Sequence, residues 1–220
     1  METLSSLLTT DGKQNEHPKN GYSLTNNIAA FHLPDDAKVR MISSHFAEIM
    51  KIMGLDPNEP GLKNTPRRIA RMYVKDLFKG LNSSAEPFII LFEDKNTHNK
   101  LTIQKNITVR SICEKYFLPI IGKAQIAYIS NGRSIGLSKL NRIVDYHSSK
   151  PQTQERLTEE IANSVKEALK IQDVAVLIDA VHLSVTMRGV KDVASSTGTS
   201  YFGGKFQKED IKTEFLLAIK

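Results

Sequence analysis

Residues 135–158 have the sequence IGLSKLNRIVDYHSSKPQTQERLT. A helix is predicted to begin near Ser138 and to end at Lys150 and Pro151, because proline breaks a helix and restrains the residue before it. A longer helix is predicted from about Thr153. Its apolar residues recur at intervals of four: Leu157, Ile161, Val165 and Leu169. The stretch therefore predicts a pair of helices joined by a short link.

Segments on both sides of this helix pair have the composition of strands. Residues 87–92, 101–113 and 123–130 carry β-branched and aromatic residues in near-alternation, and residues 174–189 are predicted to form one long strand. Residues 208–219 predict a closing helix. A sheet that carries paired helices is an α+β fold.

Two further helices are predicted ahead of the first strand, over about residues 35–53 and 65–79. Residues 1–34 are polar and sustain no periodic pattern, which predicts a mobile arm. We therefore expect an N-terminal arm over 1–34, a helical region over 35–86 and a β-rich domain over 87–220.

Composition excludes several classes of protein. The chain has 220 residues and a net charge of +6, and its Lys and Arg residues are scattered, which argues against a nucleic-acid partner. No apolar stretch approaches the roughly 20 residues that span a bilayer, so no membrane segment is expected. The N-terminus lacks a basic region ahead of an apolar run, so no secretory signal is expected. Cys113 is the single cysteine, which excludes an intrachain disulfide, and we predict a cytoplasmic protein.

Two strands carry candidate functional residues. Alternate residues of a strand share a face, so the face that begins at Val174 is apolar and becomes polar from His182 onward. This is the pattern of a core that opens into a pocket, although the strand alone favours a solvent-exposed sheet end. Cys113 shares a face with Ile107 and Val109, and on its own it is most simply a small buried hydrophobic residue.

Two helix starts carry further candidates. Ser138 and Lys139 follow Gly136 where free N–H groups and the helix dipole would suit a phosphate, although an ordinary helix start accounts for them equally. Glu155 lies in the first turn of the longer helix, where a carboxylate stabilises the dipole. It could instead accept two parallel hydrogen bonds, as the adjacent ring N–H and amino group of guanine would require.

Together these motifs resemble the GTP cyclohydrolase I family. The resemblance runs in register from about residue 35 to the end. It is carried by residues 64–74, 135–144, 151–158, 181–183, 187–190 and 195–197. It implies the tunnelling fold, an antiparallel sheet with helices on one side, assembled into rings as a homodecamer with pockets at subunit boundaries. It also implies conversion of GTP and water to formate and dihydroneopterin triphosphate, on the way to tetrahydrofolate and other pterins.

The resemblance also implies roles for individual residues. Glu155 would anchor the guanine, with Gln154 beside it in the substrate site, and His182 would transfer protons. The triphosphate would be surrounded by Ser138, Lys139, Arg142, Arg188 and Arg68.

The zinc motif is where this chain departs from the family. The family pattern is Cys-Glu-His-His, in which the cysteine and the second histidine bind zinc and the first histidine assists catalysis. Here the motif is Cys113, Glu114, Lys115 and Tyr116, and the family's third ligand, a later cysteine, is replaced by Ser184. Zinc prefers thiolate and imidazole ligands, and one ligand of three remains. We therefore expect no zinc and no other cofactor, although Cys113 is kept as a doubtful catalytic candidate.

Four functional hypotheses arise. The first is a zinc-free member that binds GTP or a related purine or pterin, with ring opening lost or altered. The second is ordinary GTP cyclohydrolase activity with a metal held in another way, but His147 and His182 show no ligand spacing, and His147 is more simply a packing residue. The third is covalent chemistry at Cys113 beside Lys115. The fourth is a non-catalytic partner of an intact paralogue. Selective change of the metal positions favours the first.

Overall fold

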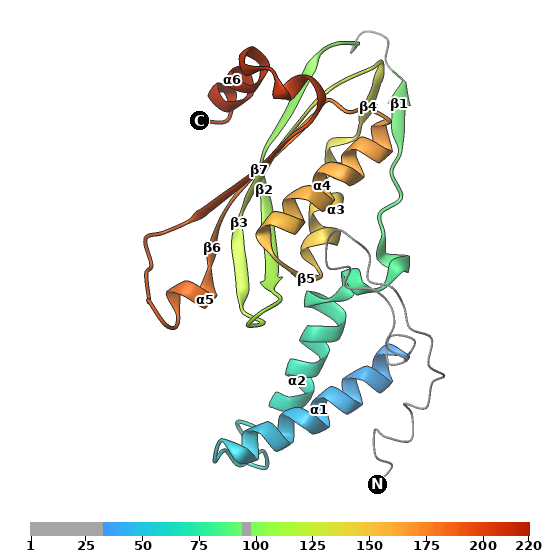
Figure 1. Cartoon of the computed structure of the whole chain (residues 1–220). Coiled ribbons are helices and arrows are strands. Elements are labelled where there is room, and N and C mark those ends of the chain that lie inside the picture. Colours follow the sequence, from blue (N-terminus) through green and yellow to red (C-terminus); the bar gives the residue numbers. More distant parts are fainter. Residues whose placement is uncertain (1–32, 94–97) are drawn as a thin grey trace, which may run out of the picture. The chain divides into compact units, whose positions relative to one another are not determined.

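A computed structural model describes residues 33–93 and 98–220 of the protein. The chain forms two compact units, the first ending at Val74 and the second spanning Lys75–Lys220 (Figure 1). The arm predicted over residues 1–34 lies almost wholly outside the described residues. The domain boundary predicted after residue 86 stays a prediction.

The first unit contains two packed helices. α1, Asp35–Ile52, has two aspartates in its first turn, where negative charge suits the helix dipole. α2, Thr65–Arg71, has a proline at its start, and the chain continues as a π-helix, η3, Met72–Leu77. The rings of Phe46 and Tyr73 stack with centroids 6.1 Å apart. Both predicted helices are confirmed.

The second unit is built on a five-stranded sheet with the order β5-β2-β3-β6-β7, in which only the β2–β5 pair is parallel. The strands are β2 (Leu101–Cys113), β3 (Pro119–Ile129), β5 (Pro151–Gln152), β6 (Val174–His182) and β7 (Thr197–Phe202). A separate pair joins β1 (Leu91–Glu93) to β4 (Arg133–Ile135). The turns η4 (Lys79–Leu81) and η5 (Ser83–Ala85) precede β1.

Helices lie against both faces of this sheet. α3 (Leu137–Ser148) and α4 (Gln154–Leu169) lie side by side on one face, as the sequence predicted, and Thr153 caps α4 by accepting from the Arg156 N–H (Figure 1). α6 (Glu209–Ala218), which confirms the predicted closing helix, follows a short turn, η7 (Gly204–Gln207). None of the helices in the described part of the chain is long and apolar enough to cross a membrane.

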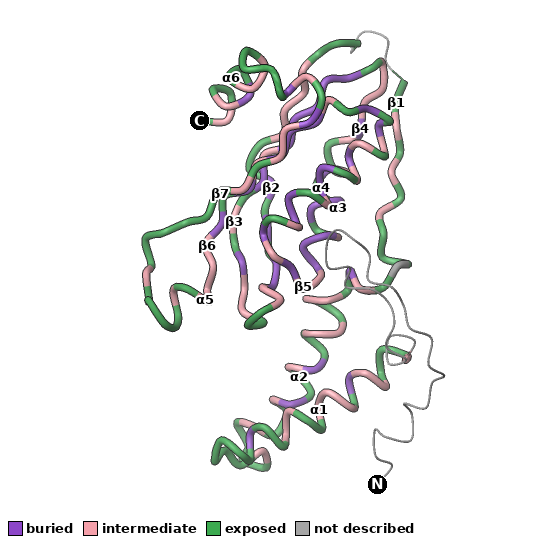
Figure 2. The backbone as a smooth tube through the Cα atoms, in the orientation of Figure 1, coloured by how far each residue is buried: buried purple, intermediate pink, exposed green. Residues whose placement is uncertain are grey.

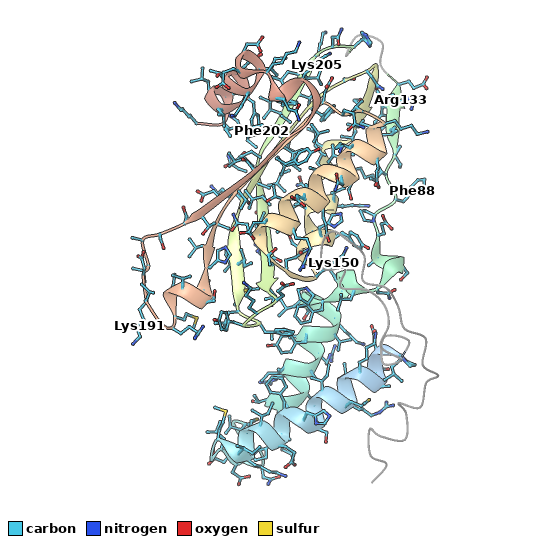
Figure 3. All side chains as sticks on the ribbon, in the orientation of Figure 1. Phe88, Arg133, Lys150, Lys191, Phe202 and Lys205 are labelled. Atoms are coloured by element: carbon cyan, nitrogen blue, oxygen red, sulfur yellow. The ribbon has the colours of Figure 1, made fainter. Side chains whose placement is uncertain are left out.

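Alternate residues of β6 divide the core into two clusters. Val174, Val176 and Ile178 are fully buried among residues of α3 and α4, and this cluster accounts for most of the buried backbone in Figure 2. Ala175, on the opposite face, packs with Phe206 and Phe215 from η7 and α6. Phe202, labelled in Figure 3, meets Phe215 edge to face at 6.2 Å between ring centroids.

The long strand predicted over residues 174–189 is wrong beyond His182, because the chain turns there into a short helix, α5, Leu183–Thr186. The reason is that neither adjacent strand, β3 or β7, pairs with the chain beyond His182. The ladder between β3 and β6 ends at the pair Ile120–His182, and the β7 ladder ends at Ala180–Thr197. Polar residues after His182 therefore do not continue the strand face.

Two other strand predictions need correction, and one strand lacks a prediction. The strand expected over 87–92 is β1, Leu91–Glu93, and the one expected over 123–130 starts earlier, at Pro119. β7 was not predicted. Its polar sequence, TGTSYF, lacks the apolar alternation that identifies a half-buried strand.

β3 and β6 approach each other closely at Gly122, so that a side chain at this position would collide with β6. A Cβ at Gly122 would lie 2.1 Å from the Asp179 carbonyl oxygen and 2.5 Å from the Ala180 Cα, and neither backbone atom can move without breaking the ladder. Gly122→Ala is therefore expected to lower the free energy of unfolding by about 2–3 kcal/mol, measured by urea denaturation. Gly198→Ala in β7, where no atom lies within 4 Å of the added methyl, is the matched control. Equal loss in both variants would contradict this account.

Candidate functional site

Cys113 is the last residue of β2 and is half-buried. The predicted face of this strand is confirmed, since Ile107 and Val109 are buried beneath Cys113 on the same side. The chain then turns sharply: the Cys113 N–H donates to the Leu118 carbonyl at 2.8 Å, and the Phe117 N–H donates to the Cys113 carbonyl at 2.8 Å. Because the strand ends at Cys113, Lys115 lies in the turn and is exposed.

The start of α4 is fastened to this turn. The Glu114 N–H donates to the Gln152 carbonyl at 3.0 Å, and the Arg156 guanidinium donates to the Glu114 carboxylate and, at 2.8 Å, to the Gln152 side-chain oxygen. This ion pair is largely buried, so removing one partner would leave a costly unpaired charge. The network holds the first turn of α4, which carries Gln154 and Glu155, beside the end of β2.

His182 lies at the end of β6 and faces the same helix start. Its Nε2 is 2.7 Å from the Oε1 of Gln154, whose side chain is 1% exposed. Burial lowers the pKa of His182, and the nearby Glu155 carboxylate opposes that shift without cancelling it. The imidazole is therefore neutral at pH 7, which is the form that can take up a proton. Glu155 itself is exposed.

Tyr116, in the turn that follows Cys113, contacts the side chain of Arg188. The Arg188 guanidinium carbon lies 4.2 Å from the centroid of the Tyr116 ring, a cation–π geometry. Both side chains are exposed. Ser184 lies on α5 and is half-buried.

The three candidates on α3 lie away from this group. α3 and α4 form a hairpin, so the start of α3 and the start of α4 are at opposite ends of the pair (Figure 1). The rise along α3 from Ser138 to its last residue is about 15 Å. Arg142 lines a cavity of about 280 Å³ with Lys79 and Asp145, which pair at 2.7 Å.

The predicted site residues lie in separate groups. The structure brings His182 together with Gln154 and Glu155, and Tyr116 together with Arg188. It does not join either group to Ser138, Lys139 and Arg142, and Arg68 lies on α2 in the first unit.

Comparison with known proteins decides the family. The sequence-family model described as GTP cyclohydrolase I matches residues 42–220 of this chain. The chain belongs to the GTP cyclohydrolase I family. A curated GTP cyclohydrolase 1 from Flavobacterium johnsoniae is 48% identical over 191 residues, 87% of this chain and 86% of that protein. A GTP cyclohydrolase 1 from Erwinia tasmaniensis is 42% identical over 189 residues, which are 86% of this chain and 86% of that protein. A solved structure, apo archaeosine synthase QueF-Like, aligns at 16% identity with a TM-score of 0.39, over 46% of this chain and 90% of that one.

The mixed α+β architecture, a curled sheet with paired helices, is accordingly the tunnelling fold of the GTP cyclohydrolase I family, as predicted. The residues that the sequence resemblance predicts at the family's zinc positions carry a thiol, a phenol and a hydroxyl: Cys113, Tyr116 and Ser184. Phenol and hydroxyl groups do not deprotonate readily, and the Tyr116 ring is already engaged by a cation. This donor set does not fit a zinc ion.

The described residues offer no alternative cluster of metal ligands. Within residues 33–93 and 98–220, no three or more His, Cys, Asp and Glu side chains are grouped to hold a metal. The expectations of no zinc and no cofactor remain predictions.

A buried polar network around His147 was not foreseen. His147 packs between α3 and α4, as expected for a packing residue, but its Nδ1 lies 2.9 Å from Glu160 Oε2 and its Nε2 lies 2.7 Å from Ser164 Oγ. Burial raises the pKa of Glu160, but the His147 hydrogen bond and the Lys150 charge outweigh it, so the pKa is lowered overall. Lys150, labelled in Figure 3, also lies over the Tyr146 ring at 4.3 Å. In the sequence, the signal for this network is that His147 and Glu160 lie on two neighbouring helices of the predicted pair.

Proposed function

We propose that this GTP cyclohydrolase I family member binds GTP or a related purine or pterin, and that the family's zinc-dependent ring opening is lost or altered in it. The observation that carries the proposal is the set of side chains at the zinc positions. Zinc lowers the pKa of its bound water far below that of bulk water, to about 7. A site with one thiol, a phenol engaged by Arg188 and a serine hydroxyl has no means to supply that hydroxide.

Support for ligand binding comes from what the chain retains. Glu155 is exposed in the first turn of α4, where its carboxylate is free to accept two hydrogen bonds from a guanine edge. Ser138 lies in the first turn of α3, whose N-terminal end is suited to a phosphate, and Lys139 and Arg142 add positive charge to the same helix. Loss of selection on the whole site would be expected to change these positions as well as the metal positions.

The separation of these groups supports an oligomeric site. The start of α3 and the start of α4 are at opposite ends of one hairpin, so one chain does not present a single pocket for base and triphosphate. We propose that neighbouring copies complete the pocket in a homo-oligomer, with the decamer of the family as the expected ring. We also propose a cytoplasmic location, because the single cysteine leaves no intrachain disulfide that an oxidising compartment would maintain.

The proposal is tested by calorimetric titration of GTP into the purified ring in the presence of a chelator, with formate measured in the same samples. The host should lack its own GTP cyclohydrolase. We expect saturable binding that the chelator does not change, and no formate. Absence of binding to GTP and to a reduced pterin would refute the ligand proposal. Formate release would favour an active enzyme with a metal held in another way. Co-purification of a second chain with the intact Cys-His-His set would favour a non-catalytic partner.

A further inference from the structure

We infer that Gln154 is a positioning residue that fixes His182 in one tautomer, with the proton on Nε2 and the lone pair on Nδ1. The hydrogen-bond partners of the Gln154 carboxamide determine the tautomer, because most of them can only accept a hydrogen bond and cannot donate one.

The amide nitrogen of Gln154 has its place fixed by the backbone. Its Nε2 lies 2.7 Å from the Thr197 carbonyl and 3.1 Å from the Ile178 carbonyl, and both oxygens only accept. Turning the carboxamide over would place Oε1 against two carbonyl oxygens at these distances and leave no donor between them. The orientation therefore follows from the chemistry of the surroundings rather than from an assignment of the two atoms.

Two threonine hydroxyls complete the same scheme. Thr158 donates its hydroxyl hydrogen to the Gln154 backbone carbonyl at 2.8 Å. The 2.7 Å contact between Thr158 and Thr199 is then donated by Thr199, because Thr158 has no second hydrogen. The Thr199 oxygen is left as an acceptor facing Gln154 Nε2 at 3.2 Å. Every group around the amide nitrogen is thus an acceptor.

The oxygen of the carboxamide consequently faces the imidazole. Gln154 Oε1 lies 2.7 Å from His182 Nε2, and an amide oxygen only accepts, so Nε2 must carry a hydrogen. In the neutral ring Nδ1 then holds the lone pair, and no described side chain or backbone group is hydrogen-bonded to it. A ligand group that meets Nδ1 of the neutral ring must therefore be a donor. This last consequence rests on the proposed ligand site, whereas the tautomer does not.

His147 supplies an internal contrast. Its Nδ1 lies 2.9 Å from the Glu160 carboxylate, which also accepts from Gln152 Nε2, and 3.5 Å from the Lys150 ammonium, which can only donate. The shorter contact, with the carboxylate, places the hydrogen on Nδ1. Its Nε2 then accepts from the Ser164 hydroxyl. The buried His147 and the half-buried His182 are thus expected to be opposite tautomers.

The test is magic-angle-spinning nitrogen NMR of the intact oligomer with ¹⁵N-labelled histidine, near pH 8 and without ligand. Signals are assigned by their loss in His182→Asn and His147→Asn. We expect a protonated Nε2 and an unprotonated Nδ1 for His182, and the reverse for His147. A protonated Nδ1 in neutral His182 would overturn the inference, and this outcome is independent of whether GTP binds.

Two variants separate positioning from simple packing. Gln154→Met removes the acceptor and should move both His182 nitrogen signals toward the values of an averaged pair of tautomers, with His147 unchanged. Thr199→Val leaves the two carbonyls in place and should leave the His182 tautomer unchanged. Unchanged His182 signals in a folded Gln154→Met protein would contradict the assignment. If that variant does not fold, the spectrum of the unmodified protein still decides.

Discussion

The combined variant Lys115→His, Tyr116→His and Ser184→Cys is expected to bind about one zinc per chain, and the unmodified chain is expected to bind none. Tyr116→His and Ser184→Cys add one imidazole and one thiolate ligand to Cys113, which completes a three-ligand set with an open fourth position, and Lys115→His restores the histidine that is not a ligand. Complete structural zinc sites are worth about 10–16 kcal/mol at neutral pH, and a single thiolate supplies only a small part of this. Replacing Tyr116 also removes the ring under Arg188. Zinc per chain, measured by elemental analysis after dialysis, is the readout.

Single substitutions provide the matched controls. Lys115→His alone adds a histidine at a position that is not a ligand in the family, so no zinc is expected. Tyr116→His alone gives two ligands and should bind zinc only weakly. If the combined variant folds and still lacks zinc, the turn after β2 and the α5 segment do not bring Cys113 and residue 184 together, and the assignment of the zinc positions is wrong.

The second large effect is expected at Glu155. Glu155→Ala should weaken binding of GTP by at least about 100-fold, because hydrogen bonds to a charged group contribute about 1.5–3 kcal/mol each and the carboxylate would accept two. Glu155→Gln retains one acceptor oxygen and loses the charge, so its affinity for GTP should lie between that of Glu155→Ala and that of the unmodified protein. The measurement is calorimetric titration of GTP into each variant and into the unmodified protein at the same ionic strength.

Glu159→Ala is the appropriate control for Glu155. Glu159 is on the same helix, one turn later, and is also exposed. Its loss should change the affinity by less than about twofold, since Glu159 has no proposed hydrogen bond to the base and an exposed charge in water contributes little. Comparable losses in Glu155→Ala and Glu159→Ala would indicate a general electrostatic effect and would remove Glu155 from the base-binding role.

The helices were predictable from sequence because their signals are local. Pro151 breaks the chain, Thr153 caps α4, and the intervals from Leu157 to Leu169 give its buried face. The end of β6 was not predictable in this way. Alternation continues past His182 in the sequence, but the strand stops where its neighbours stop, and pairing with β7 is set by residues far along the chain.

The candidate site shows the same division. The motifs around Glu155 and Cys113 predict the residues of the site and the change at the zinc positions. The environment of Gln154 depends on Thr197 and Ile178, which lie 43 and 24 residues away and come from two different strands. No local pattern reports such a contact, so the coupling of Gln154 to His182 required the structure.

The central claim is that Cys113, Tyr116 and Ser184 do not hold a zinc ion able to supply hydroxide. It is tested most directly by saturating the purified, unmodified protein with zinc, removing the excess, and measuring bound metal and formate release from GTP in the same sample. The account predicts a zinc content far below one per chain and formate at the level of a protein-free blank. About one zinc per chain, with formate release that a chelator abolishes, would contradict it.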